Sequence, residues 1–198
     1  MAPALSEFSL SIDVLKASGN RQGEETMPKL TSVKVALNIP YLGGVEGTWE
    51  PDETEQRAAW DMYVELVTRI SVVELRPGEG LLHEALSSLY SLFDTTRRIL
   101  REYGPSIARP KGRDNISFGY LAIAILNGVL RPVLAKWHPL LLHYQTAKPE
   151  SISPVEYEWQ WANNEQLLKE LNDVRGILIE YVNLLAEVAK VPPLGIRA

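Results

Sequence analysis

The sequence contains no cysteine, and this absence excludes several kinds of site. Disulfide bonds, zinc sites with thiolate ligands and cysteine nucleophiles all need that residue. A chain without cysteine fits the reducing cytosol, and its first residues, MAPALSEFSLSIDV, carry no signal-peptide pattern. We therefore expect a cytoplasmic protein. Its 198 residues suffice to bury roughly 70% of the surface that the unfolded chain exposes.

Neither sign of charge is in large excess, because 20 lysines and arginines face 25 aspartates and glutamates. The net charge of −5 gives no global field that attracts nucleic acid or anionic lipid. Long uninterrupted apolar runs are also missing. The most apolar segment, 118–144, carries Asn127, Arg131, Lys136 and His138. This segment is typical of a buried helix, so we predict no contact with a membrane.

Recognisable cofactor motifs are absent as well. The chain has three histidines, His83, His138 and His143, with no i,i+4 pair and no H-E-x-x-H string. We therefore expect no metal site and no cofactor. There is no G-x-S-x-G string, and the glycine-rich stretch 43–47 is not followed by the lysine of a phosphate-binding loop.

Four segments carry an apolar residue every three or four positions. A repeat that averages 3.5 residues predicts a helix with a narrow stripe that packs along another helix. Four such helices with short linkers predict a bundle. The stripes contain Trp60, Tyr63, Val67 and Ile70; Leu82, Leu86, Leu89, Phe93, Thr96, Leu100 and Tyr103; Ile123, Leu126, Leu130, Val133, Trp137, Leu140 and Tyr144; and Leu167, Leu171, Val174, Leu178, Tyr181, Leu185 and Val188.

Capping and stop signals give the bounds of these helices. Asp52 with Glu55 predicts a capping box for a first helix that ends at Arg76, and Gly104 ends a second helix over about 79–103. Ser153-Pro154-Val155-Glu156 opens a fourth helix that runs to about Lys190.

The third predicted helix, over about 116–145, contains two prolines. Pro132 and Pro139 each remove one backbone donor and crowd the carbonyl four residues earlier, which belongs to the small residues Gly128 and Ala135. We expect the helix to continue through both prolines with a bend.

Residues 1–50 have a different period. Apolar residues alternate with polar ones over 8–14 and 33–39, which predicts two strands of a hairpin, and 40–50 form a glycine-rich connector. A lone hairpin is marginal in water, so it must lie on the bundle, pair with a second copy or complete a partner's sheet. The predicted fold is mainly α: a four-helix bundle over 51–198 with an N-terminal β-hairpin within 1–50.

Arg131 and His138 are seven residues apart, which places them on one helix face about 10 Å apart. Their string, RPVLAKWH, resembles the R-x6-H motif of HEPN-family ribonucleases, which are small helical bundles. The resemblance implies a metal-independent endoribonuclease that acts as a dimer, with Arg131 as phosphate ligand and His138 as acid–base group. The simpler interpretation makes both residues solvated or capping groups beside Trp137.

A second candidate site is a basic cluster at one end of the predicted bundle. It could bind phosphate or nucleic acid, or it could complement the negative end of the second helix dipole. Its members are Arg97, Arg101, Arg109, Lys111 and Arg113.

The absence of a catalytic signature favours a non-enzymatic helical module that interacts with a protein partner or a second copy of itself. The runs GTWEPDETEQRAAWDMYVELVTRI and GEGLLHEALSSLYSLFDTTRRILREYGPS resemble an uncharacterised bacterial helical-bundle family of defence gene clusters. That resemblance implies an adaptor or regulatory subunit of a bacterial multi-protein system, such as an antiviral defence system. The HEPN-like ribonuclease and an RNA- or nucleotide-responsive sensor that uses the basic cluster remain the alternatives.

Overall fold

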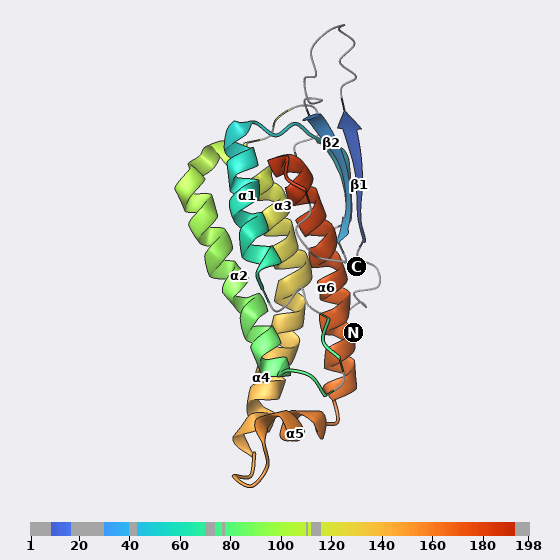
Figure 1. The fold of residues 1–198 in the computed structure, drawn as a ribbon, viewed down its shortest axis with the longest axis vertical. Coiled ribbons are helices and arrows are strands. Elements are labelled where there is room, and N and C mark those ends of the chain that lie inside the picture. Colours follow the sequence, from blue (N-terminus) through green and yellow to red (C-terminus); the bar gives the residue numbers. More distant parts are fainter. Residues whose placement is uncertain are drawn as a thin grey trace, which may run out of the picture.

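The protein is described by a computed structural model over residues 9–16, 30–39, 43–69, 74–76, 78–109, 111 and 116–192. Four long helical segments form a bundle, with a small antiparallel sheet beside it (Figure 1), which confirms the predicted fold class. The elements are β1 (Ser9–Lys16), β2 (Leu30–Ile39), β3 (Gly43–Trp49), α1 (Glu53–Val67), α2 (Leu82–Tyr103), the 3₁₀ helix η3 (Gly104–Ala108), α3 (Phe118–Ile125), the π-helix η4 (Leu126–Leu130), α4 (Arg131–Thr146), α5 (Pro154–Trp159) and α6 (Asn164–Ala189).

The start of α1 follows its sequence signal, whereas its end does not. The Asp52 side chain accepts from the Glu55 amide, and the Glu55 side chain accepts from the Asp52 amide, so the predicted capping box is confirmed. The prediction that this helix reaches Arg76 is wrong, because α1 ends at Val67. Just beyond that end, the Arg69 guanidinium donates to the Ser88 carbonyl at 3.2 Å and ties the chain to α2.

The predicted fourth helix is divided into α5 and α6, so the prediction of one continuous helix is wrong. The Ser153 cap is confirmed, since its side chain accepts from the Glu156 amide. The break is held by one local and one tertiary contact. Across it, the Asn164 side chain donates to the Glu158 carbonyl at 3.0 Å. Trp161 packs edge-on against Trp137. No glycine or proline marks this break in the sequence.

The segments α3, η4 and α4 form one helix from Phe118 to Thr146 that continues through Pro132 and Pro139, as predicted. A π-turn directly precedes Pro132, which the sequence did not predict. This helix is long and apolar enough to cross a membrane, and 56% of its most apolar window is buried inside the structure. Core helices of bundles meet the same criteria of length and composition.

The sheet has three strands in the order β1-β2-β3, both pairs antiparallel. The predicted hairpin is confirmed, but the segment 40–50 is more than a connector, because β3 lies within it. This strand was not predicted because the segment is rich in glycine. Its pairing with β2 places Trp49 opposite Val33 and Gly47 opposite Val35. Val33, Val35 and Trp49 are fully buried in the same hydrophobic core as the helices. The sheet therefore packs on the chain's own bundle, beside α6 (Figure 1).

The apolar stripes of the long helices supply most of the core. All seven stripe positions on α6 are buried, and on α2 the positions from Leu82 to Thr96 are buried while Leu100 and Tyr103 are partly buried. Two positions of the stripe over 123–144 were predicted wrongly, since Ile123 and Leu140 are nearly half exposed. The π-turn rotates the residues before it relative to those after it. Positions counted at 3.5 residues per turn therefore fall outside the buried face at both ends of the stripe.

The stripe predicted on α1 is confirmed in part. Tyr63 is fully buried and Val67 is partly buried against the core, whereas Trp60 is exposed. The buried face of the helix also includes Glu55, Ala59, Met62 and Leu66. Ile70 lies outside the described residues.

Glu55 is fully buried and joins four parts of the chain. Its Oε1 accepts from the Trp49 indole at 3.2 Å and from the Phe118 amide at 3.0 Å. Its Oε2 accepts from the Asp52 amide at 3.4 Å and from Lys111 Nζ at 3.0 Å. The carboxylate thus fixes β3, the start of α1, the start of α3 and the linker before it. With four donors, one of them the Lys111 cation, the burial of its charge is compensated.

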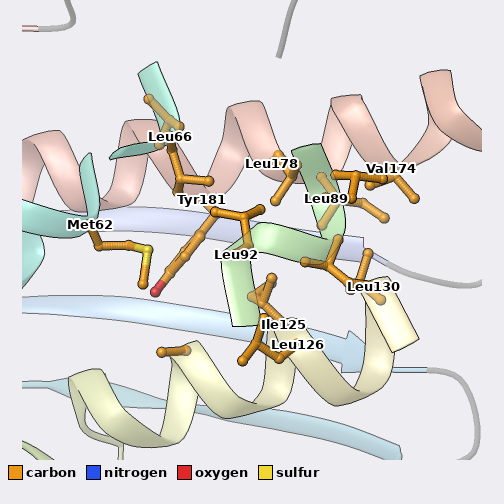
Figure 2. Packing of buried hydrophobic residues seen from close by; sticks show 14 of the residues in the cluster. Met62, Leu66, Leu89, Leu92, Ile125, Leu126, Leu130, Val174, Leu178 and Tyr181 are labelled. Carbon is orange, nitrogen blue, oxygen red and sulfur yellow. The ribbon is translucent and has the colours of Figure 1, made fainter. Parts of the chain in front are cut away.

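The Tyr181 hydroxyl is also buried, but it differs from the Glu55 carboxylate in its hydrogen bonding. It has no hydrogen-bond partner among the described residues, and burial raises the pKa of Tyr181. Its ring reaches from α6 into the core and its oxygen points toward Met62 (Figure 2). An unpaired buried hydroxyl costs about 1–3 kcal/mol of desolvation.

We predict that Glu55→Gln lowers the free energy of unfolding by about 3 kcal/mol, because an amide cannot accept from all four donors and leaves Lys111 without its buried counter-ion. Urea denaturation followed by circular dichroism measures the change. The control is Glu53→Gln, which neutralises an exposed acid in the same helical turn. Equal unfolding midpoints for the two variants would contradict the role assigned to Glu55.

We also predict that Tyr181→Phe leaves stability unchanged or raises it by about 1 kcal/mol, since it removes only the unpaired hydroxyl. The matched variant is Tyr144→Phe, which removes a hydroxyl that donates to the Tyr157 carbonyl at 2.9 Å and should destabilise the fold. Thermal unfolding compares the two. A Tyr181→Phe protein as unstable as Tyr144→Phe would mean that the Tyr181 hydroxyl does have a partner.

Candidate functional site

A pocket of about 230 Å³ lies between α2 and α4. It includes both residues of the R-x6-H string, Arg131 and His138, together with Arg97 from the predicted basic cluster. The remaining lining residues are mostly aromatic or aliphatic. The complete lining consists of Tyr90, Phe93, Arg97, Arg131, Leu134, Ala135, His138 and Pro139.

A seven-residue spacing on both helices produces this arrangement. On α2, Tyr90 and Arg97 are seven apart, and His83 precedes Tyr90 by the same interval. On α4, Arg131 and His138 repeat the spacing. Residues seven apart lie on one side of a helix, so each helix carries a polar and aromatic stripe beside its apolar one. The two helices run side by side in opposite directions, which brings the stripes together (Figure 1).

A buried carboxylate fixes the register of these two helices. Glu158 accepts from the Leu82 amide at 2.7 Å and from the Gln145 side chain at 2.7 Å. The first contact caps the start of α2, whose own cap residue, Leu81, offers no side-chain hydrogen bond. The second holds the last turn of α4. Because one side chain holds both helix ends, it determines which residues of α2 lie opposite Arg131 and His138.

The two pocket arginines lie over one ring. The Arg131 guanidinium carbon is 5.2 Å from the centre of the Phe93 ring, and that of Arg97 is 5.9 Å away. Both distances are in the range of cation–π attraction, which holds two like charges near one another.

Each of these arginines also has one polar partner. Arg97 Nη1 donates to Asp94 Oδ1 at 2.6 Å, and Arg131 Nε donates to Asn127 Oδ1 at 3.0 Å. A guanidinium has five N–H donors, so each arginine keeps donors for a ligand.

Three aromatic rings form the other half of the site. The His138 ring lies 6.0 Å from Tyr90 with planes 13° apart, and 6.3 Å from His83 with planes 21° apart. Tyr90 is 60% exposed, whereas the two histidines are partly buried. Neither His83 nor Tyr90 was predicted as a site residue from the sequence. The signal for them is the seven-residue spacing from His83 to Tyr90 and from Tyr90 to Arg97.

Among the residues that the structure describes, Arg97 is the member of the predicted basic cluster that lines the pocket. Arg101 and Arg109 are exposed and do not line the pocket, and Arg113 lies outside the described residues. Lys111 forms ion pairs with Asp52 at 2.5 Å and Glu55 at 3.0 Å. Its charge is therefore already balanced within the fold.

The pKa values at this ion pair agree with a structural role. Burial alone would lower the pKa of Lys111, but the hydrogen bonds to Asp52 and Glu55 outweigh it and raise the pKa. Burial alone would raise the pKa of Asp52, but the hydrogen bonds from Lys111 and the Glu55 amide outweigh it and lower the pKa. Both groups thus stay ionised at neutral pH.

The donor set of the pocket defines its chemistry. Two guanidinium groups favour an anion, the exposed ring favours a planar partner, and an imidazole can transfer a proton near neutral pH. Over the part of the chain that the structure describes, no group of three or more histidine, cysteine, aspartate or glutamate side chains could hold a metal ion. A volume of 230 Å³ is smaller than the roughly 300–1,000 Å³ of pockets that enclose drug-sized ligands. A ligand of that size would therefore remain partly outside the pocket.

The comparisons with known proteins add no family. No protein-family model matches the chain, and no curated protein or solved structure is significantly similar to it.

Proposed function

We propose that this chain is a non-enzymatic helical interaction module that binds a phosphorylated ligand in the pocket between α2 and α4. The observation that carries this proposal is the convergence of Arg97 and Arg131, from two different helices, over the ring of Phe93. Arginine suits phosphate because its planar fork donates two parallel hydrogen bonds to phosphate oxygens. A ligand held by both arginines would link α2 to α4.

The charge of the chain favours a small ligand over a long polyanion. The net charge of −5 opposes the approach of an extended nucleic acid, and the other described members of the basic cluster, Arg101, Arg109 and Lys111, do not line the pocket. A compact phosphate group needs only the local field of the two arginines.

Exposed apolar side chains support the interaction role. Tyr120 and Ile123 on α3 and Leu140 and Leu142 on α4 are each between 39% and 51% exposed. A cytoplasmic adaptor would use such side chains to contact a protein partner. The proposed bacterial defence setting rests on the sequence resemblance alone.

We predict that Arg97→Gln and Arg131→Gln each weaken the binding of ribose 5-phosphate about tenfold or more, because hydrogen bonds to charged groups contribute about 1.5–3 kcal/mol. Isothermal titration calorimetry at low salt measures this effect. Arg57→Gln on α1 removes the same charge from an exposed site away from the pocket and should leave the affinity unchanged.

Two results would contradict the proposal. One is the absence of binding to the wild-type protein. The other is an Arg57→Gln variant that loses as much affinity as the pocket variants. Arg101→Gln tests whether the basic cluster, and not the pocket, is the binding surface, since Arg101 belongs to that cluster but does not line the pocket.

A second candidate function is a metal-independent endoribonuclease. It is favoured by one observation, that Arg131 and His138 line the same pocket. Arg131 would hold the scissile phosphate and His138 would transfer a proton. The partly buried His83, with its ring 6.3 Å from that of His138, would be a second group able to exchange a proton.

For this second candidate, we predict cleavage of single-stranded RNA in the presence of EDTA, and loss of cleavage in His138→Ala and Arg131→Ala. His143→Ala is the matched control, because His143 is an exposed histidine of α4 that does not line the pocket. Light scattering would show the dimer that this reading requires. A pure wild-type protein that leaves RNA intact would exclude this function.

A further inference from the structure

We propose that the phosphorylated ligand is a nucleoside monophosphate, with its phosphate on Arg97 and Arg131 and its base stacked on Tyr90. This inference rests on the proposed function and extends it from a phosphate to a ligand class. Its basis is the division of the pocket into a cationic end and an aromatic end.

Tyr90 is the ring available for stacking. It is 60% exposed, more than any other large hydrophobic side chain among those that the structure describes. Its ring is nearly parallel to that of His138, at 6.0 Å, so the two rings are already aligned for a planar ligand. Bases stack on aromatic side chains in many nucleic-acid-binding proteins, and such contacts depend little on base identity.

Phe93 is not available in the same way. It is only 8% exposed and lies near both guanidinium groups. Phe93 therefore belongs to the cationic end of the pocket, where its ring positions the two arginines. The exposed end of the pocket is formed by Tyr90 and His138.

The separation of the two ends identifies the ligand. Tyr90 and Arg97 are seven residues apart on α2, and His138 and Arg131 are seven apart on α4, which gives about 10 Å between their backbone positions. The long arginine side chains can shorten this span. A nucleoside monophosphate has a sugar between its ring and its phosphate, so it can reach both ends at once. In a phosphotyrosine the phosphate is attached directly to the ring, which would place that ring beside Phe93 and leave Tyr90 unused.

The lining between the two ends of the pocket is apolar. Leu134 and Ala135 lie between Arg131 and His138 on α4, and both line the pocket of about 230 Å³. The phosphate and the base would contact the two ends, and the sugar would lie over the small side chain of Ala135 with its hydroxyl groups toward solvent.

The experiment is isothermal titration calorimetry of the full chain with four probes: AMP, ribose 5-phosphate, adenosine and O-phosphotyrosine. We expect AMP to bind about tenfold more tightly than ribose 5-phosphate, an advantage of about 1.4 kcal/mol. Tyr90→Leu should remove this advantage, so that AMP loses about tenfold more affinity than ribose 5-phosphate does. Tyr90→Phe should keep it, because the phenyl ring retains the stacking face. Adenosine and O-phosphotyrosine should each bind more weakly than AMP.

Tyr120→Leu is the matched control, since it removes a partly exposed tyrosine of α3 that does not line the pocket. The inference is overturned if AMP binds no more tightly than ribose 5-phosphate, if Tyr90→Leu weakens both ligands equally, or if O-phosphotyrosine binds more tightly than AMP. In each of these cases binding of ribose 5-phosphate would still support the proposed function. If neither AMP nor ribose 5-phosphate binds, the proposed function fails as well.

Discussion

The architecture depends on one constraint: the oxygens of a buried carboxylate must accept hydrogen bonds from nearby donors. Glu55 meets it with the Trp49 indole, the Phe118 amide, the Asp52 amide and the Lys111 ammonium group. Trp49 and Asp52 lie within 6 residues of Glu55, whereas Lys111 and Phe118 lie 56 and 63 residues away. Satisfying the charge therefore also ties β3 and α1 to the start of α3 and the linker before it. A mis-assembled chain would leave the charge unpaired, at a cost of several kcal/mol. Glu55 thus contributes to the specificity of the fold as well as to its stability.

The same constraint at Glu158 leads to the candidate site. This carboxylate accepts hydrogen bonds from the Leu82 amide and from the Gln145 side chain. It therefore holds the start of α2 against the end of α4. The two helices then face each other with Arg131 near Phe93 and His138 near Tyr90. The pocket is therefore formed by rigid helices whose alignment is fixed by a buried contact outside it. Sites on such elements hold their side chains more precisely than sites on loops.

The two proposed functions use one set of residues but make different demands on it. Binding of a phosphate needs only the fixed positions of Arg97 and Arg131, and stacking of a base needs Tyr90 in addition. Cleavage needs in addition that His138 exchange a proton with a substrate, and its present neighbours are the rings of Tyr90 and His83. Aromatic packing of this kind restrains an imidazole, which suits a recognition surface. The geometry for this reason favours ligand binding over catalysis.

The sequence by itself determined the four helical segments, most positions of their apolar stripes, the Asp52 and Ser153 caps and the seven-residue spacing of Arg131 and His138. These are local features, set by backbone geometry and by residues within two turns of one another. It did not determine β3, the break between α5 and α6 or the meeting of Arg97 with Arg131, because each depends on contacts between segments and not on a periodic pattern within one segment. β3 needs β2 as a partner, and the break is held by Asn164 and Trp161. The pocket itself exists only because tertiary packing aligns α2 with α4, and a pattern along one helix holds no information about the register of its neighbour.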